Sequence, residues 1–258
     1  MGQPRFASPN AVESLSNFFA DSMWQSKHRQ TLFYTARTLG LLLAFLLLPQ
    51  PCLAFMYRAE SVEGWVVDGE TGKPLQDVVV VAYWQLKGGL EGGNPIGQLH
   101  IFEAQTDQAG RYFVPAWGPR FAFSGTLRNE SPGLVFFKPG YRFRALDNKW
   151  FPGRDSSLSD WNGKAVRLHS FEGTAVEYSK SLSPLSDTLW GVGHVWGEPC
   201  GWKSFPRMLR AIDAQDSAFR RAGISHASIV TTLRANDSRL VAAGCGSVEG
   251  VLTRRRPK

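Results

Sequence analysis

The chain has 258 residues, three cysteines and a formal net charge of +7 at pH 7. Part of the positive excess lies in the terminal run Arg254–Lys258, so the sequence does not predict the continuous basic face that a nucleic-acid-binding protein needs. It also lacks a Gly-Lys-Ser/Thr phosphate loop, a dinucleotide-binding fingerprint and a Gly-x-Ser-x-Gly nucleophile elbow, which excludes those nucleotide-binding and serine-hydrolase patterns.

The first predicted element is an export signal within residues 1–54. An apolar run, Leu39–Leu48, follows three basic residues and precedes a Pro-Gln-Pro break and a small-residue site. This is the order of a signal peptide, and the run is shorter than the ~20 apolar residues that a spanning helix needs. We expect cleavage between Ala54 and Phe55. We also expect Met23 to be the true start, because the acidic residues of the segment precede it.

An uncleaved N-terminal anchor is the alternative, because Phe55–Tyr57 extends the apolar segment beyond the prolines. The protein would then contact the membrane through this segment alone. A lipoprotein site at Cys52 is not favoured, because Pro-Gln-Pro stands where a small-residue lipobox would be. The predicted location is periplasmic or extracellular, with anchoring by a single N-terminal helix as the alternative.

Two cysteines, Cys200 and Cys245, remain after the predicted cleavage. An even number in an oxidising compartment predicts a disulfide between them, worth ~3–4 kcal/mol in the chain-entropy model. No second Cys or His stands at metal-ligand spacing from Cys200, so neither a metal nor a cofactor is predicted.

Residues 60–170 predict a β-sandwich. Short runs are rich in Val and aromatic residues or alternate between apolar and polar residues. Turns rich in Gly, Pro and Asp separate them. The predicted strands are Val62–Asp68, Asp77–Trp84, His100–Thr106, Tyr112–Trp117, Gly133–Lys138 and Ala165–Leu168. Because Val78–Val81 is apolar on both faces, we place it in the centre of a sheet, and we expect Lys87–Gln98 to form a loop.

Residues 171–258 predict a helix-containing C-terminal extension. Pro206–Ala222 has helical periodicity, with Ser204 as the expected N-cap and Gly223 as the stop. Ile229–Leu233 fits either a short strand or a helical turn. The predicted fold class is therefore mainly β, a prealbumin/Ig-like β-sandwich with one amphipathic helix at about 205–222 after it.

The strand region carries a set of turn and strand residues that together form a sequence signature. It comprises Gly64, Val66, Asp68, Thr71-Gly72, Pro74-Leu75, Asp77-Val78, Val80, Thr106-Asp107, Gly110, Tyr112-Phe113 and Pro139-Gly140-Tyr141. Gly72 and Gly110 permit tight turns, as does Gly140, and Pro74 fixes φ before the second strand. On these residues Val62–Tyr141 resembles the carboxypeptidase regulatory-like domain, a transthyretin-like β-sandwich common in exported bacterial proteins.

The resemblance implies a non-catalytic scaffold used for docking, folding support or ligand contact. The chain departs from the family pattern in the long insertion Lys87–Gln98 and in the segment Arg120–Pro132. The loop surface is therefore not expected to follow the family. The C-terminal region is similar, more loosely, to small exported proteins of uncharacterised role. It has no catalytic residues to carry over.

Three histidines could support an enzyme instead. His100 and Glu103 have the His-x-x-Glu spacing of zinc carboxypeptidases, but residues three apart on a strand point to opposite faces, so we expect no shared metal. His194 stands among glycines that would bring backbone close to a ligand. A hydrolase would require at least two of His100, His194 and His226 to converge with a carboxylate in a cleft.

The chain is also rich in tryptophan. We expect Trp65 and Trp84 in the core, whereas Trp150, Trp161, Trp190, Trp196 and Trp202 fall in polar, Gly-rich or Pro-rich sequence. Exposed aromatics stack on sugars or anchor partner proteins, and they also pin one part of a protein onto another. His194, Trp196 and Trp202 are therefore the candidate ligand contacts, although packing of the extension explains them as well.

The sequence thus predicts an exported, non-enzymatic β-sandwich protein that serves as a binding or structural module of the cell envelope. Its predicted partner is an envelope protein or a glycan, and no nucleic acid is expected. A membrane-anchored assembly factor and a hydrolase built on His194, His226 or His100 are the alternatives.

Overall fold

The computed structural model describes residues 55–88, 93–153, 155–194 and 199–254. The predicted export signal, its start at Met23 and its cleavage after Ala54 lie outside these residues. Among the described helices, none combines the length and apolar character needed to cross a bilayer.

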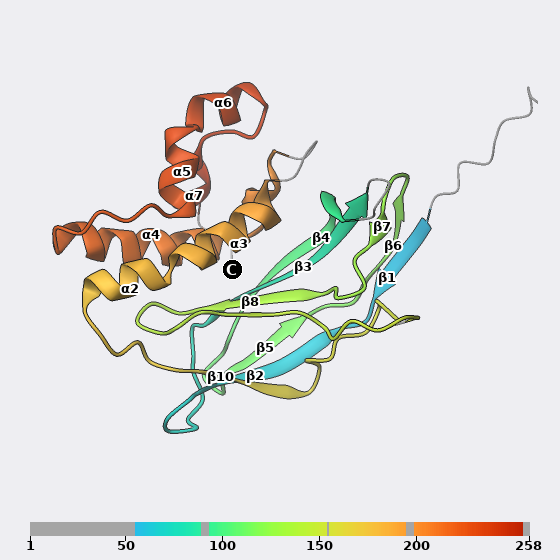
Figure 1. Ribbon diagram of the computed structural model, residues 1–258, viewed down its shortest axis with the longest axis horizontal. Coiled ribbons are helices and arrows are strands. Elements are labelled where there is room, and N and C mark those ends of the chain that lie inside the picture. The colour runs from blue at the N-terminus through green and yellow to red at the C-terminus, as the bar shows by residue number, and fades with distance from the viewer. Residues whose placement is uncertain (1–54, 89–92, 154, 195–198, 255–258) are drawn as a thin grey trace, which may run out of the picture. The chain divides into compact units, whose positions relative to one another are not determined.

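The chain is mainly β, with a β-sandwich followed by a helical extension, as the sequence predicts (Figure 1). The small sheet has the order β10 (Lys164–Leu168), β2 (Val62–Asp68), β5 (Arg111–Val114). The large sheet has the order β4 (Asn94–Gln105), β3 (Val79–Gly88), β8 (Gly133–Phe137), β9 (Arg144–Leu146), with β7 (Thr126–Leu127) also on β3. A separate ribbon pairs β1 (Phe55–Ala59) with β6 (Trp117–Ala122).

Two predicted boundaries are wrong. The expected loop Lys87–Gln98 is largely strand, because the β3–β4 ladder continues to the pair Gly88–Asn94. Backbone pairing does not require side chains, so the glycines there do not end the ladder. The expected strand Tyr112–Trp117 is divided, since β5 pairs with β2 and the chain then moves to β1 as β6.

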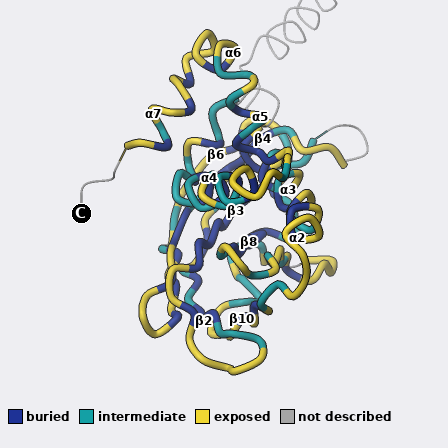
Figure 2. The backbone as a smooth tube through the Cα atoms, turned by 90° about the vertical axis from the view of Figure 1, so that its left-hand side faces the viewer, coloured by how far each residue is buried: buried dark blue, intermediate teal, exposed yellow. Residues whose placement is uncertain are grey.

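Strand β3 is buried on both faces and lies between β4 and β8, which confirms its predicted central position. Its alternate residues belong to different cores. Val80, Ala82 and Trp84 belong to the sandwich core between the two sheets, whereas Val79, Val81 and Tyr83 belong to the helix-side core. Figure 2 shows the buried strands of the large sheet in dark blue between the small sheet and the helices.

The helical extension covers the outer face of the large sheet. It comprises α2 (Ala175–Ser181), α3 (Ser183–Gly193), η1 (Gly201–Ser204), α4 (Pro206–Arg221), α5 (Ile229–Ala235), α6 (Asp237–Ala242) and α7 (Val248–Thr253). α4, which coincides with the predicted helix, is the longest of the described helices and has the clearest sequence period. The others have 11 residues or fewer and depend on packing against the sheet, which no local pattern reveals. The open alternative at Ile229–Leu233 is decided in favour of helix α5.

The start of α4 differs from the prediction. Ser204 lies in η1, and the residue at the N-cap is Phe205, whose side chain cannot accept a hydrogen bond. The carboxylate of Glu103, on β4, takes over this role by accepting a hydrogen bond of 2.7 Å from the backbone N–H of Met208. A strand residue about a hundred positions away thus caps the helix, and no local sequence pattern could predict it.

Glu103 forms a polar contact between the large sheet and the helices. Burial raises the pKa of its carboxyl, and hydrogen bonds from the backbone of Met208 and Arg207 oppose that rise. Truncation of Glu103 would leave the N–H of Met208 buried without an acceptor.

We therefore expect Glu103→Ala to lower the free energy of unfolding by about 1–3 kcal/mol, the usual cost of an unpaired buried donor. Glu103→Gln retains an acceptor oxygen and should lose less. Urea denaturation followed by far-UV circular dichroism measures both. Glu172→Ala, at an exposed position, is the matched control. Equal losses in Glu103→Ala and Glu172→Ala would contradict the capping role.

Candidate functional site

The candidate site is a groove of about 560 Å³ between strands β4 and β5, which we call the β4–β5 groove. Three layers of the fold contribute to it: the large sheet through β4, the small sheet through β5, and the helices through the start of α4. The side chains that give it chemical character are Phe102, Glu103, Gln105, Arg111, Phe113 and Arg207.

A tight turn holds the two strands of the groove in place. Thr106 Oγ1 accepts a hydrogen bond from the N–H of Val78 and donates to the carbonyl of Leu75. Asp107 Oδ1 accepts from the N–H groups of Ala109 and Arg111. Gly110 has φ +72°, a conformation that favours glycine, and a Cβ there would lie 2.5 Å from the carbonyl oxygen of Val66.

The two arginines of the groove differ in their partners. Arg111 forms a bidentate ion pair with Glu63, with nitrogen–oxygen distances of 2.7 and 2.8 Å. Hydrogen bonding from Arg111 lowers the pKa of Glu63. Arg207 is half-buried, and no carboxylate of the described residues lies within ion-pair distance of its guanidinium. Its nearest acidic neighbour, Glu103, is already engaged by the backbone of α4. The groove therefore contains a cation with spare hydrogen-bonding capacity.

The three candidate histidines do not converge. His100 packs against the rings of Trp84 and Trp117, with ring centroids at 5.8 and 5.2 Å. His100 lies on the side of β4 that faces Trp84, whereas Glu103 faces α4, so the two side chains point to opposite faces of the strand, as expected for residues three apart. His194 is exposed at the end of α3 and stacks on Trp190.

His226 is the only one of the three with a carboxylate close by, within the described structure. Its Nε2 lies 3.9 Å from Oδ1 of Asp216, and both side chains are almost completely buried. Ser228 donates its hydroxyl proton to Asp216 and also caps α5 by accepting from the N–H of Thr231. In a nucleophile–base–carboxylate arrangement the histidine would lie between the serine and the carboxylate, whereas here Ser228 bonds Asp216 directly. Burial raises the pKa of Asp216 and lowers that of His226.

Within residues 55–254, leaving aside the undescribed positions, no three His, Cys, Asp or Glu side chains are grouped closely enough to hold a metal ion.

For tryptophan, one open alternative is decided in favour of packing and one expectation is wrong. Trp202 is completely buried in the helix-side core, because η1 turns it inward beneath α3, and it offers no surface to a ligand. Trp65 is 37% exposed, because it alternates with the buried residues of β2 and faces away from the sandwich core. Trp84 is fully buried, as expected, and Trp196 lies outside the described residues.

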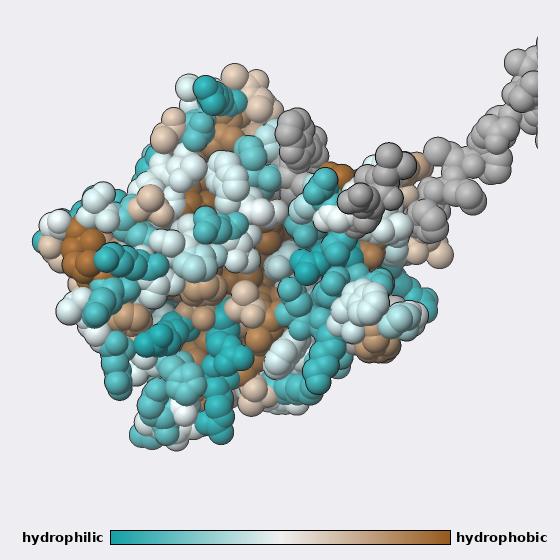
Figure 3. Space-filling view, viewed as in Figure 1, coloured by the Kyte–Doolittle hydropathy of each residue, from teal (hydrophilic) through white to brown (hydrophobic). Residues whose placement is uncertain are grey.

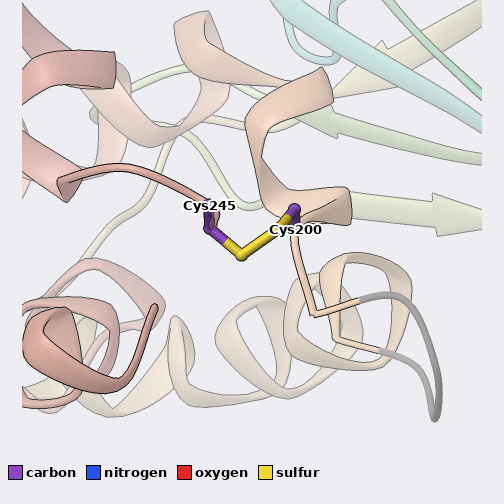
Figure 4. Close-up of a disulfide and its surroundings, with 2 residues drawn as sticks. All are labelled: Cys200 and Cys245. Carbon is purple, nitrogen blue, oxygen red and sulfur yellow. A yellow bond between two sulfur atoms is a disulfide. The ribbon is translucent and has the colours of Figure 1, made fainter. Parts of the chain in front are cut away.

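Cys200 and Cys245 form a disulfide, as predicted (Figure 4). Cys200 precedes η1, and Cys245 lies in the connection between α6 and α7, 45 positions later. The bond therefore closes the part of the extension that contains α4, α5 and α6.

The turn positions named for the family resemblance have the expected geometry. Gly72 has φ +67° and Gly140 has φ +85°, both in the region that favours glycine. Pro74 forms an isolated β-bridge with Val67, just before the turn that leads into β3. Asp68 accepts hydrogen bonds from the backbone and the hydroxyl of Thr71 across the same turn.

No protein-family model and no curated protein matches the chain. Among solved structures, the 3-chlorocatechol 1,2-dioxygenase from Rhodococcus opacus 1CP is similar over 48% of this chain and 64% of that chain, with 16% identity and a TM-score of 0.28. The chain thus spans less than two thirds of that dioxygenase. A likeness this weak carries no information about activity.

Sequence reasoning did not select the groove residues Phe102, Gln105 and Arg207. Each is an ordinary residue in its own segment, and Arg207 follows Phe102 by about a hundred positions. The only sequence signal nearby was the Thr106-Asp107 turn with Gly110, which predicts the bend but not the groove beside it.

Gly64, the first residue of the family-like pattern, allows a close approach between strands. A Cβ at this position would lie 2.6 Å from Tyr112 Oη and 2.7 Å from the carbonyl oxygen of Lys164. We expect Gly64→Ala to lower the free energy of unfolding by ~1–3 kcal/mol through overpacking. Gly191→Ala, in α3 with open space around it, is the control and should be neutral or slightly stabilising. Chemical denaturation compares the two, and a stable Gly64→Ala protein would refute the close approach.

His100 should make stability depend on pH. Burial, assisted by Arg120, lowers the pKa of His100 to about 4, below its ordinary value of 6.5. The unfolded chain therefore binds the proton more readily, so the contribution of His100 is fully present above pH 6.5 and is lost as the pH falls toward 4.

We expect the loss of stability between pH 7.5 and pH 4.5 to be smaller in His100→Gln than in the parent. Denaturation midpoints at both pH values measure this difference, and the shared titration of carboxylates cancels in the comparison. His194→Gln, at an exposed histidine, is the control for the histidine-to-glutamine change itself. A loss in His100→Gln as large as in the parent would disprove the assignment.

Proposed function

We propose that this chain is an exported, non-catalytic β-sandwich protein that acts as a binding or structural module of the cell envelope. The Cys200–Cys245 disulfide is the observation that carries the proposal, because such bonds persist outside the reducing cytoplasm. The apolar run Leu39–Leu48, with its signal-like order, supports export independently.

The environment of each histidine supports a role without catalysis. His100 packs among tryptophans, His194 stacks on Trp190 at a helix end, and His226 is buried beside Asp216. Asp216 is itself engaged by a helix-capping serine. Each group therefore has a packing role, and no two of the three histidines face a common cleft.

The resemblance to the carboxypeptidase regulatory-like domain supports a docking or scaffold role. The turn geometry at Gly72, Gly110 and Gly140 agrees with that pattern. We propose an envelope protein as the partner, with a glycan as the alternative ligand. Figure 3 shows hydrophilic and hydrophobic residues interspersed on one face of the molecule, an ordinary surface for a protein in an aqueous compartment.

The test is the intact mass of the protein recovered from the envelope fraction, before and after reduction and thiol alkylation. We expect a chain that starts at Phe55 and has no alkylatable thiol until it is reduced. A mass that retains residues 23–54 would assign the protein to the anchored class instead. Recovery in the cytoplasmic fraction, or alkylation of Cys200 and Cys245 without reduction, would refute export.

A further inference from the structure

The ribbon of β1 and β6 packs one face on the sandwich and turns the other to solvent. Ala59 and Ala122 are buried in the sandwich core, and Tyr57 packs against the same core. Side chains alternate along a strand, and directly opposed residues of an antiparallel pair share a face. Met56 and its partner Phe121 therefore point away from the core.

This outward face is apolar. Met56 is 64% exposed and Phe121 is 56% exposed, while Phe123, which follows β6 directly and continues its alternation, is 75% exposed. We call these three side chains the ribbon face. Scattered apolar residues are ordinary on a protein surface, but neighbouring large ones on one face indicate contact with a partner or a membrane.

The sequence before β1 indicates which contact this is. The apolar run Leu39–Leu48 has the order of an export signal, and six residues, Pro49–Ala54, separate it from the start of β1 at Phe55. Six residues of fully extended chain span at most about 20 Å. When a bilayer holds the run, during export or as an anchor, β1 begins near the surface of that bilayer. The ribbon at one end of the sandwich is thus the first folded element beside the lipid (Figure 1).

The charges of the ribbon are nearly balanced. Its strands contain Arg58 and Arg120 and no acidic residue. Arg120 is engaged, because its guanidinium lies over the ring of Trp117 and donates a hydrogen bond to the carbonyl of Leu99. Arg58 is exposed, and Glu60, directly after β1, lines the same hollow. Burial of apolar side chains, rather than charge, is therefore the main source of attraction to a lipid surface.

We propose that the ribbon face contacts a lipid bilayer and inserts Met56, Phe121 and Phe123 among the headgroups and the upper acyl chains. The chain connection to the predicted export signal favours lipid over a protein partner. Three side chains are also too few to supply the ~800 Å² per partner that a stable protein interface buries. A second copy of this chain is further disfavoured by repulsion between two chains of net charge +7.

This inference adds a lipid surface to the partners of the proposed envelope module, and it rests on that proposed function. Contact with the membrane then no longer requires that the N-terminal segment be retained. The two tests are separate, because lipid contact is measured on purified protein and export is measured by intact mass. An exported protein without lipid contact would lose the inference alone. A protein that contacts lipid but is not exported would lose only the proposed function.

The test uses an environment-sensitive nitrobenzoxadiazole label attached at Ser124→Cys, next to the ribbon face. The matched control is Ser225→Cys, which is exposed between α4 and α5, in the helical layer across the large sheet from the sandwich core. The probe surface is vesicles of phosphatidylcholine, alone or with about one third phosphatidylglycerol. Protein recovered without residues 1–54 is mixed with vesicles, and protein that retains them is reconstituted, with Cys52→Ser to prevent labelling there. We expect the label at position 124 to brighten and shift to shorter wavelength, and the label at 225 to remain unchanged.

Two variants test the apolar contact itself. Phe123→Ser should weaken vesicle binding by about tenfold, which corresponds to the loss of one inserted phenylalanine side chain. Phe123→Leu retains an apolar side chain and should bind nearly as well as the parent. Val241→Ser, at an exposed apolar position on α6, should bind like the parent. Co-sedimentation with vesicles measures these differences, and in an anchored form the response of the label at 124 replaces it.

Several results would overturn the proposal. These are an unchanged label at 124, an equal response of the label at 225, or equal binding of Phe123→Ser and Phe123→Leu. Binding that requires phosphatidylglycerol and disappears at high salt would show electrostatic adsorption instead of insertion. A dimer in sedimentation velocity that Phe121→Ser dissociates would show that a second copy covers the ribbon face. Unchanged far-UV circular dichroism establishes that the variants are folded.

Discussion

The whole architecture depends on the burial of β3 on both faces. A strand with valines at consecutive positions cannot leave either face in water, so it requires one layer on each side. The small sheet covers one face, and the helical extension covers the other. The extension is therefore a structural layer of the same folded unit, and the disulfide closes part of it.

Glu103 connects this packing to the candidate site. It lies on β4, the neighbour of β3, and its carboxylate replaces the missing N-cap of α4. This contact fixes the start of α4 beside the sheet edge, where Arg207 lines the groove. Burial raises the pKa of Glu103, and the charge of Arg207 lies close enough to the Glu103 carboxylate to oppose that rise.

The groove also shows why an edge strand can remain open in a stable protein. Glu103 and Ala104 are buried as residues, and rings and arginines flank the backbone between them. The edge is recessed between two sheets, so a flat partner such as another large sheet has poor access to it.

The sequence by itself determined the strand-rich class, the central place of Val78–Val81, helix α4 and the Cys200–Cys245 bond, because each depends on local periodicity or on residue type. It failed where partners are distant. The inward turn of Trp202, the capping of α4 by Glu103 and the short helices all follow from packing. The groove was equally invisible, since its walls come from three layers that meet only in the folded chain. Tertiary structure alone decided those features, because burial and hydrogen-bond partners are properties of the assembled layers.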